Sequence, residues 1–99
     1  MQRKRIVIEV RGRKGEYWAE TAYAWLREDI ADILSREYGV EIDVRFVEED
    51  RDEPVIACCG EVLEEIPGEP GYLIEALKKL LDKVVMSGAS QGPGGDDGA

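Results

Sequence analysis

The strongest constraint on the fold is the alternation of apolar and charged residues in the segment VEIDVRFVEED, residues 40–50, which is strict from Val40 to Phe46. Successive side chains of a β-strand point to opposite faces of a sheet. The pattern therefore predicts a strand that buries one face and leaves the other in water. The residues of the apolar face are Ile42, Val44 and Phe46, and those of the charged face are Glu41, Asp43 and Arg45.

Three further segments predict strands. RIVIEV, residues 5–10, alternates and is rich in β-branched residues. VIACC, residues 55–59, is a short apolar run, and VLEEI, residues 62–66, follows it after a tight turn that we expect at Gly60-Glu61. A turn this short joins two strands only as an antiparallel hairpin.

Two segments predict helices. Between residues 16 and 38 the apolar side chains recur at helical spacing, and Gly39 supplies a stop signal. The expected buried stripe of this helix consists of Ala22, Leu26, Ile30 and Ile33. Residues 72–86, YLIEALKKLLDKVVM, repeat the pattern with an aliphatic face of Leu73, Leu77, Leu80, Leu81 and Val84.

The elements follow the order β-α-β-β-β-α in one α/β domain, residues 1–86, and we expect the Gly-rich tail, residues 87–99, to be disordered. A strand-helix-strand crossover is right-handed and makes the first two strands parallel. Only EEDRDE, residues 48–53, joins the second strand to the third, which leaves no room for a helix. Both helices must then cover one face of a mixed four-stranded sheet, and the other face should be open.

This order resembles the thioredoxin-like fold in its small, glutaredoxin-like form, over residues 5–84. Pro54, Gly60-Glu61-Val62 and Gly68 stand in the order of the proline, turn and glycine that surround the third and fourth strands of thioredoxins. The segment YLIEALKKLL resembles the closing helix of that fold. Because the proline of thioredoxins is usually cis, the resemblance implies a cis peptide bond before Pro54.

The resemblance also implies an active site at the start of the first helix, where redox members carry Cys-x-x-Cys. Glu16 and Ala19 stand at those two positions here. Thiol exchange needs an attacking thiolate and a resolving thiol. Neither residue can supply one, so we expect a non-redox member of the fold.

Composition excludes several classes of function. The net charge of -9 argues against a nucleic-acid surface, which needs clustered positive charge. The absence of histidine removes Ser-His and Cys-His nucleophiles and the commonest metal ligand. We therefore favour a protein that is not an enzyme and that holds no cofactor or metal. No apolar run is long enough to span a bilayer, which predicts a cytoplasmic protein. The chain has few amide side chains and many Glu, Lys and Arg, which is typical of the proteins of thermophiles.

Cys58 and Cys59 are the only cysteines of the chain. In a strand their side chains would point to opposite faces, and their Cα atoms would lie about 3.8 Å apart, below the usual disulfide range of about 4.4 to 6.8 Å. A disulfide between them would need a distorted turn. We favour cysteines packed in or near the core, with a reactive thiol, and hence a thiol oxidoreductase, as the alternative. Diverging thiolates without histidine disfavour a metal site.

The loop RGRKG, residues 11–15, precedes the first helix, and the N-terminus of a helix attracts anions. Three cations and two glycines make the loop either an anion- or nucleotide-binding site or a solvated charged turn. It is not a Walker loop, because no Gly-Lys-Ser/Thr follows. The candidate residues are Arg11, Gly12, Arg13, Lys14 and Gly15.

The open sheet face gives the third candidate site. If Ile56 faces the helices, an apolar strip of Val7, Val55, Ala57 and Cys59 should lie on the open face between charged residues. Such a strip suits a protein partner or a second copy of the chain, although a half-polar sheet in water is the alternative. The sequence thus favours a binding or scaffold module that uses the open face or the basic loop. A homodimer through the open face is one form of this hypothesis.

Overall fold

The computed structural model describes residues 4–89, with side chains described through residue 84. The order β-α-β-β-β-α that the sequence predicts is present, with the first helical pattern divided into three segments. Among the described residues, no helix combines the length and the apolar character needed to cross a membrane. The elements are β1 (Arg5–Gly12), α1 (Tyr17–Trp25), the π-helical segment η1 (Leu26–Ile30), α2 (Ala31–Tyr38), β2 (Glu41–Glu48), β3 (Val55–Cys58), β4 (Glu61–Leu63) and α3 (Pro70–Ala89).

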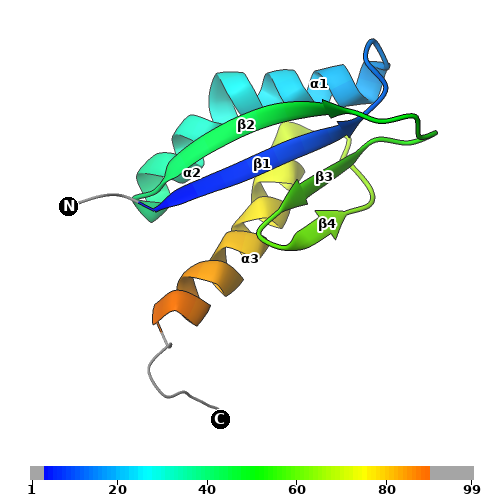
Figure 1. Ribbon diagram of the computed structural model, residues 1–99. Coiled ribbons are helices and arrows are strands. Elements are labelled where there is room, and N and C mark those ends of the chain that lie inside the picture. Colours follow the sequence, from blue (N-terminus) through cyan, green and yellow to red (C-terminus); the bar gives the residue numbers. More distant parts are fainter. Residues whose placement is uncertain (1–3, 90–99) are drawn as a thin grey trace.

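The four strands form one mixed sheet in the order β2-β1-β3-β4 (Figure 1). β1 and β2 are parallel, whereas β3 is antiparallel to both β1 and β4. This confirms the parallel first pair and the antiparallel hairpin that the sequence predicts. β1 is thus an inner strand, and β2 and β4 are the two edges.

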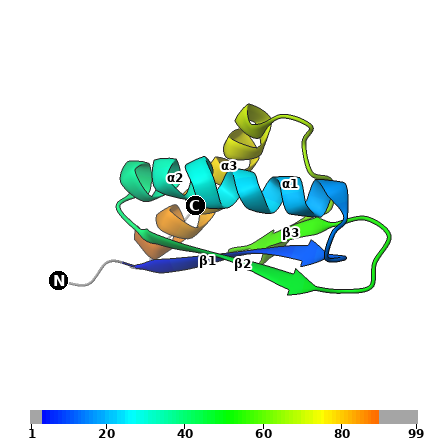
Figure 2. The ribbon, with the colours of Figure 1, turned by 90° about the horizontal axis from the view of Figure 1, so that it is seen from above.

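All helices lie on one face of the sheet, as Figure 2 shows. Residues 49–54 join β2 to β3 without a helix, so this connection places no helix on the opposite face. The prediction of a sheet with one covered and one open face is therefore confirmed.

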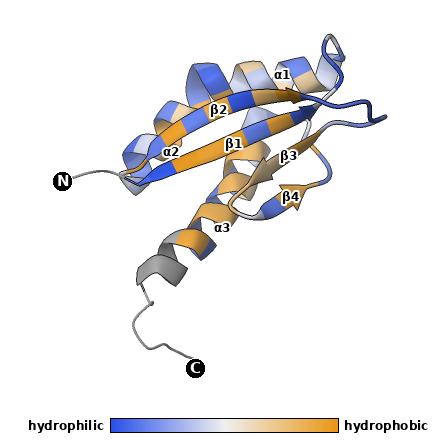
Figure 3. Ribbon diagram, viewed as in Figure 1, coloured by the Kyte–Doolittle hydropathy of each residue, from blue (hydrophilic) through white to orange (hydrophobic). Residues whose placement is uncertain are grey.

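The covered face holds the core. Ile8 and Val10 of β1 are fully buried, and the register places Val44 and Phe46 of β2 beside them. The charged residues of the same strands point to the open face, which gives the alternation of colours along β2 in Figure 3. From the helices, the core receives Ala19, Ala22, Leu26, Ile30, Leu34, Leu73, Leu77, Leu80 and Leu81.

The π-helical segment changes which residues of the first helix are buried. Leu26, Ile30 and Leu34 follow one another at steps of four and are each 0% exposed, whereas Ile33 is 40% exposed. In an α-helix of 3.6 residues per turn, a line of side chains spaced four residues apart winds gradually around the helix axis. The wider π turn opposes this winding, so the buried stripe continues to Leu34. The expectation that Ile33 belongs to the stripe is corrected.

The helix ends follow local chemistry. Gly39 has the left-handed φ of 64° that ends α2, as the sequence predicts. α3 begins at Pro70, before the predicted start at residue 72, because proline is well tolerated in the first turn of a helix. It runs to Ala89, past the predicted domain boundary at residue 86. Residues 90–99 of the predicted tail lie outside the described residues.

Candidate functional site

The structure divides the basic loop that the sequence proposes as an anion site. β1 continues to Gly12, so Arg11 belongs to the strand and lies on the open face of the sheet. Its guanidinium donates to Glu9 Oε1 at 2.7 Å. Arg13 stays in the loop and forms ion pairs with Asp50 at 3.1 Å and Asp52 at 3.5 Å. The candidate cations therefore do not converge on one ligand position.

The start of α1 is also satisfied by the protein itself. Glu16 is the N-cap and accepts a hydrogen bond from the backbone N–H of Ala19 at 2.8 Å. The backbone N–H of Gly15 donates to Glu20 Oε2, also at 2.8 Å. These carboxylates take the place that an anion would occupy at a helix N-terminus. Lys14 is exposed. Of the three loop cations, it is the one for which the described contacts include no ion pair.

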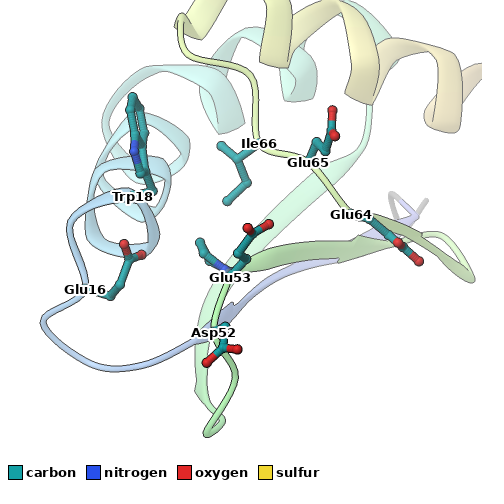
Figure 4. A pocket seen from close by; sticks show the side chains of 8 residues that line it. Glu16, Trp18, Asp52, Glu53, Glu64, Glu65 and Ile66 are labelled. Atoms are coloured by element: carbon teal, nitrogen blue, oxygen red, sulfur yellow. The ribbon is translucent and has the colours of Figure 1, made fainter.

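The hollow beside this loop has the opposite charge to the expected site. It measures about 310 Å³, and Figure 4 shows side chains from α1, from the β2–β3 connection and from the segment after β4 around it. Its acidic side chains repel an anion, whereas Trp18, Pro54 and Ile66 give it an apolar part. The carboxylates that line it are Glu16, Asp52, Glu53, Glu64 and Glu65. Within residues 4–89, no group of three or more Asp, Glu or Cys side chains is arranged to hold a metal ion.

Pro54 differs from the resemblance. There is no cis peptide bond in residues 4–89, so the bond before Pro54 is trans, and the expected cis proline is corrected. The trans form of an X–Pro peptide bond is the more stable one, and no tight turn at Pro54 requires the cis form. The proline instead packs closely on the end of β1, because a Cβ added to Gly12 would lie 3.0 Å from the Pro54 Cβ.

The open face contains three of the four residues expected for its apolar strip. The strand registers align Val7, Ala57 and Val55 on the side opposite the helices. Val7 and Ala57 are half-buried, but Val55 is only 6% exposed and adds little accessible surface. Cys59 lies beyond the end of β3, in the turn.

Val62 is an open-face residue that the sequence analysis missed. It pairs with Ala57 across the β3–β4 hairpin and is 47% exposed. With the observed turn Val62 pairs with Ala57, and with a turn at Gly60-Glu61 it would pair with Cys59, so both registers place it on the open face. The alternation of the hairpin was therefore sufficient to find it.

The charged residues of the open face are paired with each other. Arg45 Nη2 lies 2.8 Å from Asp43 Oδ2, and Arg5 contacts the same carboxylate at 3.4 Å. The hydrogen bond from Arg11 to Glu9 raises the pKa of the Arg11 guanidinium. The registers place equal numbers of cations and acids on this face: Arg5, Arg11 and Arg45, and Glu9, Glu41 and Asp43.

The two cysteines close the β3–β4 turn. Cys58 pairs with Glu61, so Cys59 and Gly60 form a two-residue loop, and both have positive φ, 63° and 80°. The predicted turn at Gly60-Glu61 is therefore wrong by one residue. The structure joins Cys58 and Cys59 by a disulfide, which was not expected for cysteines in a strand. It forms because Cys59 has left the strand for the turn.

A second hollow, of about 350 Å³, lies on the open face at this turn. Val7, Ala57 and Val62 give it an apolar floor, and Glu9 and Arg11 border it. Both cysteines and Gly60 line its end. The hollow therefore brings together the apolar strip, a neutral ion pair and the disulfide.

Compared with protein-family models, with curated proteins and with solved structures, the chain gives no significant match.

Proposed function

We propose that the protein is a thioredoxin-like binding module, without the redox site of the first helix, that associates through the open face of its sheet. The observation that carries the proposal is a sheet face without helices on which apolar side chains lie between paired arginines and acids. Exposed apolar strips with polar borders are typical of surfaces that bind another protein. The element order and the position of Pro54 before β3 support the thioredoxin-like part of the proposal.

The cations of this face favour a protein partner over a solvated surface. All of them in the described strands are arginines, Arg5, Arg11 and Arg45, whereas Lys14, Lys78 and Lys83 lie in the loop or on α3. Arginine is enriched and lysine depleted where proteins contact each other. The arginine guanidinium is also more weakly hydrated than the lysine ammonium, so it loses less when an interface excludes water.

We take the occupant of the face to be a second copy of the chain. The whole chain carries a net charge of -9, so most orientations of two copies repel each other. The part of the open face that β1 and β2 form is the exception, because its arginines and acids are equal in number. Two copies can meet there with Arg45 of one beside an acid of the other, and with their apolar strips in contact.

Light scattering over a range of protein concentrations tests this proposal. The native chain is expected to reach the mass of a dimer as its concentration rises. Val62→Asp places a charge in the apolar strip, and we expect it to weaken dimerisation at least tenfold. Ile33→Asp is the matched control, because Ile33 is a similarly exposed aliphatic residue on the helical side of the molecule.

Two results would overturn the proposal of a dimer. One is a native chain that remains monomeric at the highest concentration measured. The other is equal weakening by Val62→Asp and Ile33→Asp, which would show that added negative charge, and not the open face, controls association. Circular dichroism spectra of both variants establish that the fold is retained.

A further inference from the structure

The β3–β4 hairpin ends in a loop that is unusual for its sequence. Two-residue loops with positive φ at both positions favour Asn-Gly or Gly-Gly, because left-handed backbone is unfavourable for most side chains. Here the first position is Cys59, with a φ of 63°. The conformation turns its side chain back toward Cys58, and the two sulfur atoms are joined.

The two cysteines differ in their exposure. Cys58 is 3% exposed and belongs to the core that the helices cover. Cys59 is partly exposed and lines the hollow on the open face. A reagent in that hollow can therefore approach Cys59 more directly than Cys58.

The charges around the turn suit a disulfide better than a thiolate. Lys83 of α3 forms an ion pair with Glu61 at 3.0 Å, and Arg11 is bonded to Glu9. A thiolate is stabilised by a nearby cation, but each of these cations already has a carboxylate beside it. The pair is thus arranged to accept electrons as a disulfide and lacks the surroundings of a fast nucleophile.

We propose that Cys58 and Cys59 form a thiol–disulfide exchange site, and that a dithiol reduces it by attacking Cys59 from the hollow on the open face. The thiolate of the dithiol bonds to the Cys59 sulfur, and the bond between the cysteines breaks. Cys58 leaves as a thiolate and takes up a proton. The product of this step is a mixed disulfide at Cys59.

The second thiol of the reductant completes the reaction. It loses its proton and attacks its own partner sulfur in the mixed disulfide, which closes a disulfide within the reductant. Cys59 leaves as a thiolate and is protonated. In total, the dithiol gives two electrons and two protons to the cysteine pair. Cys59 is then no longer held by a bond to its neighbour and can leave the left-handed conformation, which loosens the pairing of β4.

The first experiment asks whether the disulfide forms and is reduced. The full chain is incubated with glutathione disulfide, unfolded in guanidinium chloride, and treated with iodoacetamide at a pH near 8.5, where thiols ionise, before mass spectrometry. We expect no labelled cysteine in the oxidised chain and both labelled after dithiothreitol. Labelling of both cysteines without dithiothreitol, or a mixed disulfide with glutathione on each of them, would overturn the proposal.

The second experiment tests, with single-thiol variants, whether the Cys59 sulfur is the more accessible of the two from the hollow. Cys59→Asn keeps a favoured Asn-Gly loop and leaves only Cys58, whereas Cys58→Ala leaves only Cys59. We expect Cys59 in the second variant to react with glutathione disulfide at least tenfold faster than Cys58 in the first. The two rates should become equal in denaturant, where the fold no longer protects Cys58.

Equal rates in the folded variants, or a faster reaction of Cys58, would show that the hollow does not direct the attack. Both experiments are run at a concentration where the chain is monomeric, because association through the open face would cover the hollow beside Cys59. Their outcome is then separate from that of the light-scattering test.

Discussion

The two faces of the sheet are built by the same strands, but they differ in almost every physical respect. On the covered face, Ile8 and Val10 have no exposed surface and belong to the hydrophobic core. On the open face, one residue away, Glu9 and Arg11 form an ion pair with side-chain exposures of 26% and 37%. The covered face buries the apolar surface that stabilises the fold, whereas the open face remains accessible for binding.

The largest difference between the faces should appear in stability. Ile8→Ala removes a fully buried side chain, and we expect it to lower the free energy of unfolding by about 2 to 5 kcal/mol. Val7→Ala, on the open face of the same strand, is expected to cost about 1 kcal/mol or less. Urea unfolding at a concentration where the chain is monomeric measures both. Similar losses for the two variants would mean that the open face is also buried in the folded protein.

A smaller effect is expected where the covered face is most crowded. A Cβ added to Gly12 would lie 3.0 Å from the Pro54 Cβ and 3.3 Å from the Ala19 Cβ. Gly12→Ala is therefore expected to destabilise the protein by about 1 to 3 kcal/mol through overpacking. Gly68→Ala is the control, because no heavy atom lies within 4 Å of its added Cβ. A Gly12→Ala variant as stable as this control would show that β1 and Pro54 are free to move apart.

The smallest effect concerns a polar contact at the border of the helical layer. The Tyr38 hydroxyl donates to Asp82 Oδ1 at 2.7 Å, and partial burial together with this bond raises the pKa of Tyr38 to about 12. The unfolded chain loses this proton near pH 10, whereas the folded chain keeps it to higher pH. The stabilisation is thus complete below pH 10 and is lost as the pH rises through about 12.

Unfolding measured from pH 8 to 12 tests this contact. The free energy of unfolding of the native chain should fall more steeply above pH 10 than that of Tyr38→Phe, which has no phenol to titrate. The two chains differ only at residue 38, so the difference between their pH profiles isolates Tyr38. Parallel pH profiles for the two chains would contradict the prediction.

Side-chain periodicity was sufficient to predict the sheet. The alternation of residues 40–50 and the short link to Pro54 together required one open face, and the structure has it. Periodicity was not sufficient for the helix, because a π-helical segment shifted the buried stripe from Ile33 to Leu34. The steps of four from Leu26 to Ile30 and Leu34 also occur in ordinary α-helices, so the apolar pattern does not reveal the wider turn.

The candidate sites were harder to predict, because each depends on a position being one residue inside or outside a strand. Arg11 was assigned to a loop but belongs to β1, which removed it from the anion site. Cys59 was assigned to a strand but belongs to the turn, which brought its sulfur to Cys58. The acidic hollow beside Trp18 combines three distant segments and has no local pattern at all.

The place of β1 inside the sheet has a consequence for how the chain is made. β1 leaves the ribosome before both of the strands that flank it in the sheet, which lie at residues 41–48 and 55–58. Until those segments are synthesised, both of its backbone edges lack partners, and such edges can pair with other chains. α1 follows β1 at once and packs on its apolar side. The nascent protein can therefore protect a face of its central strand well before it can protect either edge.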